Sequence, residues 1–213
     1  MREDYFWEKL MNWYWINKRE FPWRRTKIPY RIFIAEVLLQ QTNAEKVEPA
    51  YIKIVKKYPS IKELAGAELE ELKDIIKPLG LIYRSENLIR CAQIIEGNYN
   101  SEVPKDKEKL KELPGVGDYI ADAILCYSFD QDTIPIDTNF LRLFSRFDNL
   151  KSSYSNKKDD KDLIFEIKKY YKTVRNYRDH NFAVLDFSSQ MCKSRNPNCQ
   201  KCCLKNKCFY FNS

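Results

Sequence analysis

The sequence is short of glycine and of long apolar stretches, and both shortages exclude classes of protein. Only five glycines occur among 213 residues, and no run of alternating β-branched residues is present, so an all-β fold is not expected. The most apolar stretch, residues 32–39, is short and carries Glu36, so we expect no membrane-spanning segment. The charged N-terminus lacks the apolar core of a signal peptide, which predicts a cytosolic protein.

Histidine and nucleotide-binding motifs are equally scarce. His180 is the only histidine and has no partner pattern around it, so we expect it at the surface. No Gly-Lys-Ser or Gly-Lys-Thr follows the glycine turn at residues 113–117, which excludes a nucleotide-binding P-loop. The length allows one large domain or two small ones with a real core.

Aromatic and basic residues, by contrast, are plentiful. Hydrophobic residues make up 44% of the chain and aromatic ones 14%, which predicts a globular protein. Lysine and arginine outnumber aspartate and glutamate by 37 to 30, and the net charge of +7 permits an anionic partner without proving one. Apolar spacing predicts helices at 3–18, 32–41, 47–58, 84–97, 162–173 and 179–190, with an exposed loop at 151–162.

The glycine turn, Leu113–Gly117, is predicted to join two helices. Pro114 cannot continue the first helix, and Gly115 and Gly117 can adopt the positive φ angles of a tight reversal. The backbone N–H groups of Gly115, Val116 and Gly117 then point outward at a helix N-terminus, which suits them to bind a phosphate. The alternative is an ordinary helical hairpin with a glycine C-cap.

Polar residues lie in and after the apolar helix at 32–41. Glu36 has apolar neighbours, so its carboxylate must be paired or must face a polar cavity. The structural alternative is a glutamate that caps a neighbouring helix or pairs with an arginine. The helix ends in a neutral polar block, which can form a plain turn or can hydrogen-bond to base edges: Gln40, Gln41, Thr42 and Asn43.

Asp137 occupies the N-cap position of a predicted helix that starts at residue 138, after an extended segment at 133–136. Capping alone explains most isolated aspartates at such positions. Arg142 and Arg146 lie four residues apart on this helix, which predicts a basic stripe that is solvated or in contact with phosphate.

Four of the seven cysteines gather near the C-terminus. Cys192, Cys199, Cys202 and Cys208 are separated by six, two and five residues, which predicts a metal site with four thiolate ligands. The chemistry alone leaves Zn²⁺ and a [4Fe–4S] cluster open, and Cys203 is interpreted as a bystander. Basic residues surround these ligands: Lys193, Arg195, Lys201, Lys205 and Lys207.

Together these motifs resemble the helix-hairpin-helix DNA glycosylases of the endonuclease III and MutY superfamily. The matching segments follow the family's order: Phe21-Pro22-Trp23-Arg24, residues 36–42, the glycine turn, Ile136-Asp137-Thr138-Asn139 and the cysteine spacing. The resemblance implies an all-α fold in two helical lobes with double-stranded DNA between them. Residues 22–134 would form a six-helix barrel domain with the helix-hairpin-helix, and residues 1–21 and 135–213 a domain that holds a [4Fe–4S] cluster.

The resemblance also implies roles for the candidate residues. Asp137 is the implied catalytic carboxylate, which stabilises positive charge on the deoxyribose as the N-glycosidic bond breaks. Gln40 and Gln41 would fill the gap left by a flipped base or contact its partner, and Glu36 would hold a proton or a water for the departing base. Tyr119 stands where the bifunctional branch has a lysine nucleophile; it cannot form an imine, which predicts a monofunctional enzyme.

The substrate predicted from the resemblance is a thymine or uracil mismatched with guanine in double-stranded DNA. Tyr119, Asn139-Phe140 and residues 185–188 are similar to the mismatch-specific branch, whereas residues 40–42 are similar to MutY, which removes adenine opposite 8-oxoguanine. Against MutY, the chain ends directly after the cysteine motif, and Leu81-Ile82 replaces MutY's aromatic wedge pair.

Three alternatives stay open at this point. The first is a MutY-like adenine glycosylase, the second a non-catalytic DNA-binding module, and the third a glycosylase with lyase activity through another lysine. In each case we expect a monomer that associates with the nucleoid.

Overall fold

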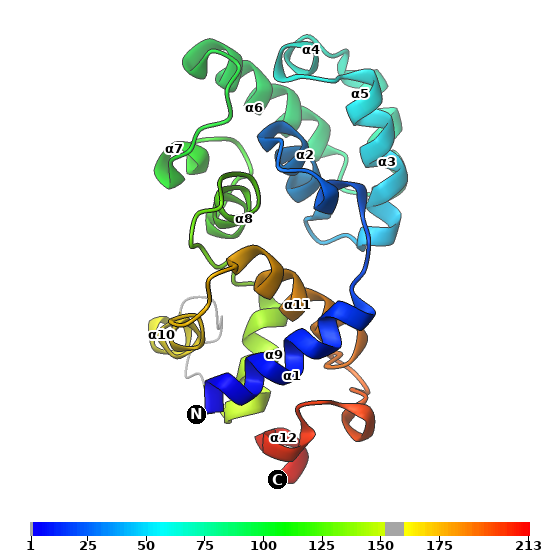
Figure 1. Ribbon diagram of the computed structural model, residues 1–213. Helices are drawn as coiled ribbons and strands as arrows, with labels where there is room; N and C mark the ends of the chain where they lie inside the picture. The colour runs from blue at the N-terminus through cyan, green and yellow to red at the C-terminus, as the bar shows by residue number, and fades with distance from the viewer. Residues whose placement is uncertain (1, 152–159) are drawn as a thin grey trace. The chain divides into compact units, whose positions relative to one another are not determined.

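The computed structural model of the protein describes residues 2–151 and 160–213, and this part of the chain is all-α (Figure 1). Twelve α-helices and several short 3₁₀ turns, with no β-strand, make up the described residues, so the predicted fold class is confirmed. The chain divides into two compact units, which we name the central unit (Glu20–Pro135) and the terminal unit (Met1–Arg19 with Ile136–Ser213). Within the described ranges, no helix combines the length and the apolar character that crossing a bilayer requires.

The central unit is built around an apolar helix, α2 (Pro29–Leu39), in which every side chain from Ile32 to Leu38 is buried. Pro29 can begin this helix because a first-turn residue has no intrahelical partner for its N–H group. Six further helices complete the unit: α3 (Ala44–Lys57), α4 (Ile61–Ala65), α5 (Leu69–Ile76), α6 (Tyr83–Tyr99), α7 (Lys107–Lys111) and α8 (Asp118–Phe129). Helix α2 packs against α3, α6 and α8, and α4 packs against α6 (Figure 1).

The terminal unit joins the two ends of the chain. Its helices are α1 (Arg2–Asn17), α9 (Thr138–Asp148), α10 (Lys161–Tyr170), α11 (Tyr177–Gln190) and α12 (Phe209–Asn212). Helix α11 packs against both α1 and α9. The core is aromatic: the Phe6 ring lies 4.9 Å from Phe144, 5.1 Å from Phe147 and 5.1 Å from Tyr170, between ring centroids. Such aromatic contacts add stability beyond the area that they bury.

The predicted helices recur with small shifts at their ends. The range 84–97 corresponds to α6 and the range 3–18 to α1. Helix α3 begins at Ala44, earlier than the predicted residue 47, because Asn43 caps it through a hydrogen bond from the Glu45 N–H group (3.0 Å). The exposed loop predicted at 151–162 falls mostly on residues 152–159, which lie outside the described residues.

His180 is half-buried in the terminal unit, so its predicted surface position is wrong. Its ring makes an edge-to-face contact with Trp7, with the centroids 4.7 Å apart. Its Nδ1 atom lies 2.7 Å from the carbonyl oxygen of Asn176. Burial lowers the pKa of His180 below its usual value of 6.5. The spacing within α11 carried no sign of this contact, because Trp7 comes from the opposite end of the chain.

Candidate functional site

Asp137 caps the N-terminus of α9 in the terminal unit. Its Oδ1 atom accepts hydrogen bonds from the backbone N–H groups of Asn139 (2.8 Å) and Phe140 (2.9 Å), so the predicted N-cap is confirmed. Its Oδ2 atom accepts a hydrogen bond from the side-chain amide of Asn139. These donors and the positive end of the helix dipole favour a negative charge at this position. The side chain is only partly buried, so the carboxylate keeps access to its surroundings.

Two arginines of α9 bind the cysteine segment of the same unit, and one of them, Arg142, also reaches Asp137 through Asn139. Arg142 donates to the side-chain oxygen of Asn139 (2.9 Å) and to the carbonyl oxygens of Ser188 (3.0 Å) and Cys192 (2.9 Å). Arg146 donates to the carbonyl oxygens of Lys193 (2.7 Å) and Ser194 (3.1 Å) and lies 3.6 Å from the Cys192 sulfur. The two arginines are therefore not simply solvated, since both guanidinium groups bind protein backbone, and contact with phosphate stays a prediction.

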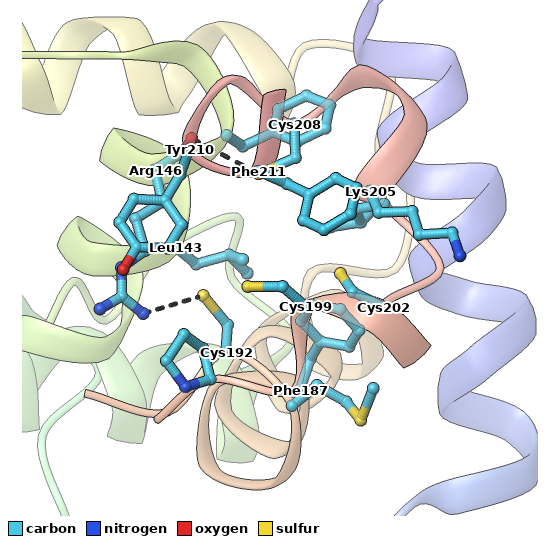
Figure 2. Close-up of a pocket in the computed structure, with 14 residues that line it drawn as sticks. Leu143, Arg146, Phe187, Cys192, Cys199, Cys202, Lys205, Cys208, Tyr210 and Phe211 are labelled. Atoms are coloured by element: carbon cyan, nitrogen blue, oxygen red, sulfur yellow. Dashed lines mark hydrogen bonds between the residues drawn. The ribbon is translucent and has the colours of Figure 1, made fainter. Parts of the chain in front are cut away.

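The four predicted ligands, Cys192, Cys199, Cys202 and Cys208, line one cavity of the terminal unit (Figure 2). The space measures about 380 Å³, part of which is open to solvent. Its other walls are largely apolar and include Leu143, Phe187, Leu204 and Phe211. Cys203 is absent from the described residues that line this cavity. Burial raises the pKa of the Cys202 thiol to about 12.

The arrangement of these thiols bears on which metal group they fit. Among the described residues, no three histidine, cysteine, aspartate or glutamate side chains are gathered tightly enough to hold a single metal ion. Four thiols that line one cavity are a donor set that suits a [4Fe–4S] cluster and that also occurs in structural Zn²⁺ sites.

The glutamine turn, which we define as residues 40–43, follows α2 in the central unit. Gln40 ends the helix, and its side-chain Nε2 atom donates to the carbonyl oxygen of Gly115 (3.0 Å). Gln41 is exposed and has a left-handed backbone, with φ of 53°. The two predicted DNA-contacting turns of the central unit are thus joined by a hydrogen bond.

The glycine turn connects α7 to α8 as predicted, but only one of its glycines has the predicted geometry. Gly115 has a φ of +78°, and a Cβ atom there would lie 2.8 Å from the Asn87 side-chain nitrogen. Gly117, the N-cap of α8, has an ordinary φ of −99°, so its predicted positive φ is wrong. A Cβ atom on Gly117 would meet open space. Val116, between them, is buried.

Glu36 and Tyr119 share a neighbourhood in the central unit. Glu36 is 4% exposed and lies in the middle of α2, within the apolar stretch where the sequence places it. The pKa of Tyr127, on α8, is raised well above its usual value by burial, and the charges of Tyr119 and Glu36 act in the same direction, while Arg24 opposes them. Glu36, Tyr119 and Arg24 therefore each lie near enough to Tyr127 for their charges to affect it.

Sequence reasoning assigned no role to Arg84, which is one of the largest fully buried side chains. The sequence did carry a signal, because Arg84 shares helical spacing with the apolar residues Leu88, Cys91 and Ile95 and so belongs to the buried face of α6.

The candidate residues divide between the units. Asp137 and the cysteines belong to the terminal unit, and the others belong to the central unit.

Comparisons with known proteins agree with the sequence motifs. The thymine-DNA glycosylase of Aeropyrum pernix is 34% identical over 96% of this chain and 93% of its own length. The thymine/uracil-DNA glycosylase of Methanothermobacter thermautotrophicus is 33% identical over 92% of this chain and 88% of its own. The solved structure of a thermostable thymine-DNA glycosylase matches with a TM-score of 0.90 at 30% identity, covering 99% of this chain and 97% of that one. The profile of the HhH-GPD superfamily of base excision DNA repair proteins matches residues 34–171, which confirms the predicted resemblance, and the chain belongs to this superfamily.

Proposed function

We propose that this protein is a monofunctional DNA glycosylase that removes thymine or uracil mismatched with guanine and leaves an abasic site in double-stranded DNA. The observation that carries the proposal is the carboxylate of Asp137, held by two backbone N–H groups at the N-terminus of α9. The relatives support the class of substrate, because two of them are named for thymine or for thymine and uracil.

Asp137 would supply electrostatic stabilisation. As the N-glycosidic bond lengthens, positive charge develops on the deoxyribose, and a fixed negative charge beside it lowers the barrier. Both donors to Oδ1 come from the backbone of α9, so the carboxylate needs no reorganisation during the reaction. Capping and catalysis are compatible because the second oxygen, Oδ2, is bonded to a side-chain amide that can move.

Glu36 and Tyr119 would act on the departing base. Glu36 is buried in α2, and a carboxyl group in such surroundings can hold a proton or orient a water molecule. Tyr119 replaces the lysine nucleophile of bifunctional relatives, and a phenol cannot form the imine that strand cleavage requires. Borohydride should therefore trap no covalent adduct between protein and DNA. An adduct would support the alternative of lyase activity through another lysine.

The glycine turn and the glutamine turn would contact DNA. Backbone N–H groups at the start of α8 can bind a phosphate, and the open space beside Gly117 leaves room for its approach. Gln40 and Gln41 can hydrogen-bond to the base left without a partner after flipping. The net charge of +7 favours association with an anionic duplex.

We further propose that Cys192, Cys199, Cys202 and Cys208 hold a [4Fe–4S] cluster. When bound, such a cluster supplies four iron–thiolate bonds that cross-link the segment between α11 and α12. The hydrogen bonds from Arg142 and Arg146 to the backbone of the same segment would orient it. The purified protein should be yellow-brown and contain about four irons per chain. A colourless protein that carries zinc after purification without air would refute this assignment.

The decisive experiment compares duplexes that contain T·G, U·G, A·8-oxoguanine or A·G pairs. Each is incubated with excess protein and then cleaved with alkali at abasic sites. We expect strand cleavage for T·G and U·G only. Cleavage confined to the adenine duplexes would support the second candidate, a MutY-like adenine glycosylase, which the residues Gln40, Gln41 and Thr42 favour.

The variant Asp137→Asn tests the carboxylate itself. Asparagine is as good an N-cap as aspartate, so the fold should be retained while excision falls by roughly 10²-fold or more. The matched control is Asp160→Asn, since Asp160 caps α10 of the same unit through the N–H groups of Asp162 (3.1 Å) and Leu163 (3.0 Å). Equal excision by both variants would refute the role of Asp137. Tight DNA binding without any excision by the unaltered protein would favour a non-catalytic DNA-binding module.

A further inference from the structure

The first turn of α6 carries a buried arginine that the proposed chemistry does not use. Arg84 is 1% exposed, and its guanidinium makes three hydrogen bonds to the end of α2 and the glutamine turn. It donates to the carbonyl oxygens of Leu38 (2.6 Å) and Gln40, and to the hydroxyl oxygen of Thr42 (2.7 Å). Only arginine presents several donors in one rigid plane, so it can reach all three acceptors at once.

These acceptors flank Gln41, whose backbone conformation is unfavourable. A left-handed φ of 53° brings the Cβ atom of a non-glycine residue too close to its own backbone. The carbonyl groups of Leu38 and Gln40 lie at the C-terminus of α2, where intrahelical partners run out. Arg84 satisfies these carbonyl groups, and its positive charge faces the negative end of the helix dipole. The hydrogen bonds on both sides of Gln41 therefore hold it in place.

The same face of α6 also contacts the glycine turn. Asn87 fills the space beside Gly115, since a Cβ atom there would lie 2.8 Å from its Nδ2 atom. The thiol of Cys91 donates to the carbonyl oxygen of Pro114 (3.2 Å). Burial raises the pKa of Cys91 to about 12, so the thiol keeps its proton. Because residues 84, 87 and 91 recur at helical spacing, one face of α6 contacts both turns.

We propose that Arg84 is a positioning residue for base recognition, which holds the glutamine turn against the glycine turn so that both meet DNA as one preformed surface. This inference rests on the proposed function, because the two turns need a fixed geometry only if they contact DNA. Arg84 itself touches no substrate. Its contribution is to keep Gln41 in a conformation that the chain would otherwise leave.

A preformed surface affects binding more than the chemical step. If the turn adopts its binding conformation for only a tenth of the time, the apparent affinity for DNA falls about tenfold. Once the duplex is bound, the carboxylate of Asp137 acts as before. Loss of Arg84 should therefore raise the protein concentration needed for half-maximal excision by roughly tenfold, and change the maximal single-turnover rate by less than about threefold.

The experiment measures single-turnover excision from a T·G duplex over a range of protein concentrations. Arg84→Met keeps the length of the side chain and removes its donors, whereas Arg84→Lys keeps the charge but reaches fewer acceptors and should restore part of the loss. The matched control is Arg90→Met, because Arg90 is an exposed arginine of the same helix. Circular dichroism and thermal unfolding report whether each variant folds.

Should Arg84→Met fail to fold, Thr42→Val replaces it, since it removes one acceptor at a half-buried position. The double variant Arg84→Lys with Thr42→Val should then show less than the sum of the two single effects, because both changes break the same hydrogen bond. A concentration dependence equal to that of Arg90→Met, in both Arg84→Lys and Thr42→Val, would overturn the inference. So would a loss confined to the maximal rate. If the unaltered protein excises no base, the proposed function fails instead, and the affinities of the same variants for the mismatched duplex decide on Arg84.

Discussion

The two units hold their irregular segments with arginine side chains at different depths. In the central unit, Arg84 is fully buried and bonds to a turn of four residues between two helices. In the terminal unit, Arg142 and Arg146 are half-buried and bond to the backbone of a longer segment. That segment, residues 191–208, contains only two 3₁₀ turns, Cys199–Lys201 and Lys205–Lys207.

The two segments differ in which groups hold them in their conformation. Side chains of the protein hold the glutamine turn, through the hydrogen bonds of Arg84 and the hydrogen bond from Gln40 to Gly115. The cysteine segment is also bonded by Arg142 and Arg146, but its four thiols line a cavity of their own, which is where the proposed cluster would bind. We therefore expect the central unit to hold its geometry by itself and the terminal unit to depend on the proposed cluster.

The largest expected effect comes from removing one ligand of that cluster. Cys199→Ser should abolish iron binding and destabilise the terminal unit by several kcal/mol, on the order of what a structural metal site contributes. Hydrogen exchange should accelerate in α9 and α12 and stay unchanged in α2 and α3. Cys203→Ser is the matched control, because Cys203 does not line the cavity. Equal protection of α9 in both variants would show that the cysteine segment is stable without a cluster.

The fold of the central unit could be predicted from the sequence to a large extent. The apolar run of α2 and the Pro-Gly of the glycine turn are local signals, and they predicted two helices and their connection. The contact between Gln40 and Gly115 could not be predicted, because it joins residues that are 75 positions apart. The positive φ predicted for Gly117 was wrong for another reason. A glycine allows a positive φ but does not require one, and here Gly117 is an N-cap with an extended backbone.

The terminal unit was predicted less completely. The cap at Asp137 and the cysteine spacing are local patterns, and the structure contains both the cap and a cavity shared by the four cysteines. The roles of Arg142 and Arg146 were missed because their acceptors are backbone carbonyl groups 46 to 50 residues away, which carry no sequence signature. His180 was misplaced for the same reason, since its neighbour Trp7 is distant in sequence.

A smaller effect is expected from substituting the two glycines of the glycine turn. Comparing the two variants separates the effect on stability from the effect on DNA binding. Gly115→Ala should destabilise the protein by about 1–2 kcal/mol, because its φ is +78° and Asn87 is close. Gly117→Ala should leave the free energy of unfolding unchanged within about 0.5 kcal/mol, since its φ is ordinary and its surroundings are open. If a phosphate approaches Gly117, the added methyl group should nevertheless weaken DNA binding.

The readout is the dissociation constant for a short duplex at several salt concentrations. Loss of one phosphate contact should reduce the salt slope by about 1 in Gly117→Ala. Gly97→Ala is the control: it lies in α6, its added Cβ atom meets nothing within 4 Å, and DNA binding should not change. An unaltered slope in Gly117→Ala would place the phosphate contact elsewhere.

The smallest expected effect distinguishes the two units by pH. His180, the only histidine, lies in the terminal unit, and burial against Trp7 lowers its pKa below the usual 6.5. The unfolded chain therefore takes up this proton at a higher pH than the folded protein does. The stability that the neutral ring contributes is complete above about pH 6.5 and decreases as the pH falls through the folded pKa. His180→Phe keeps a ring against Trp7 and removes the proton, so denaturant midpoints at about pH 7.5 and about pH 5.5 should differ slightly less in the variant than in the unaltered protein. Identical pH dependence in both proteins would mean that His180 is as accessible to protons in the folded state as in the unfolded chain, and that the aromatic core of the terminal unit is looser than its ring contacts indicate.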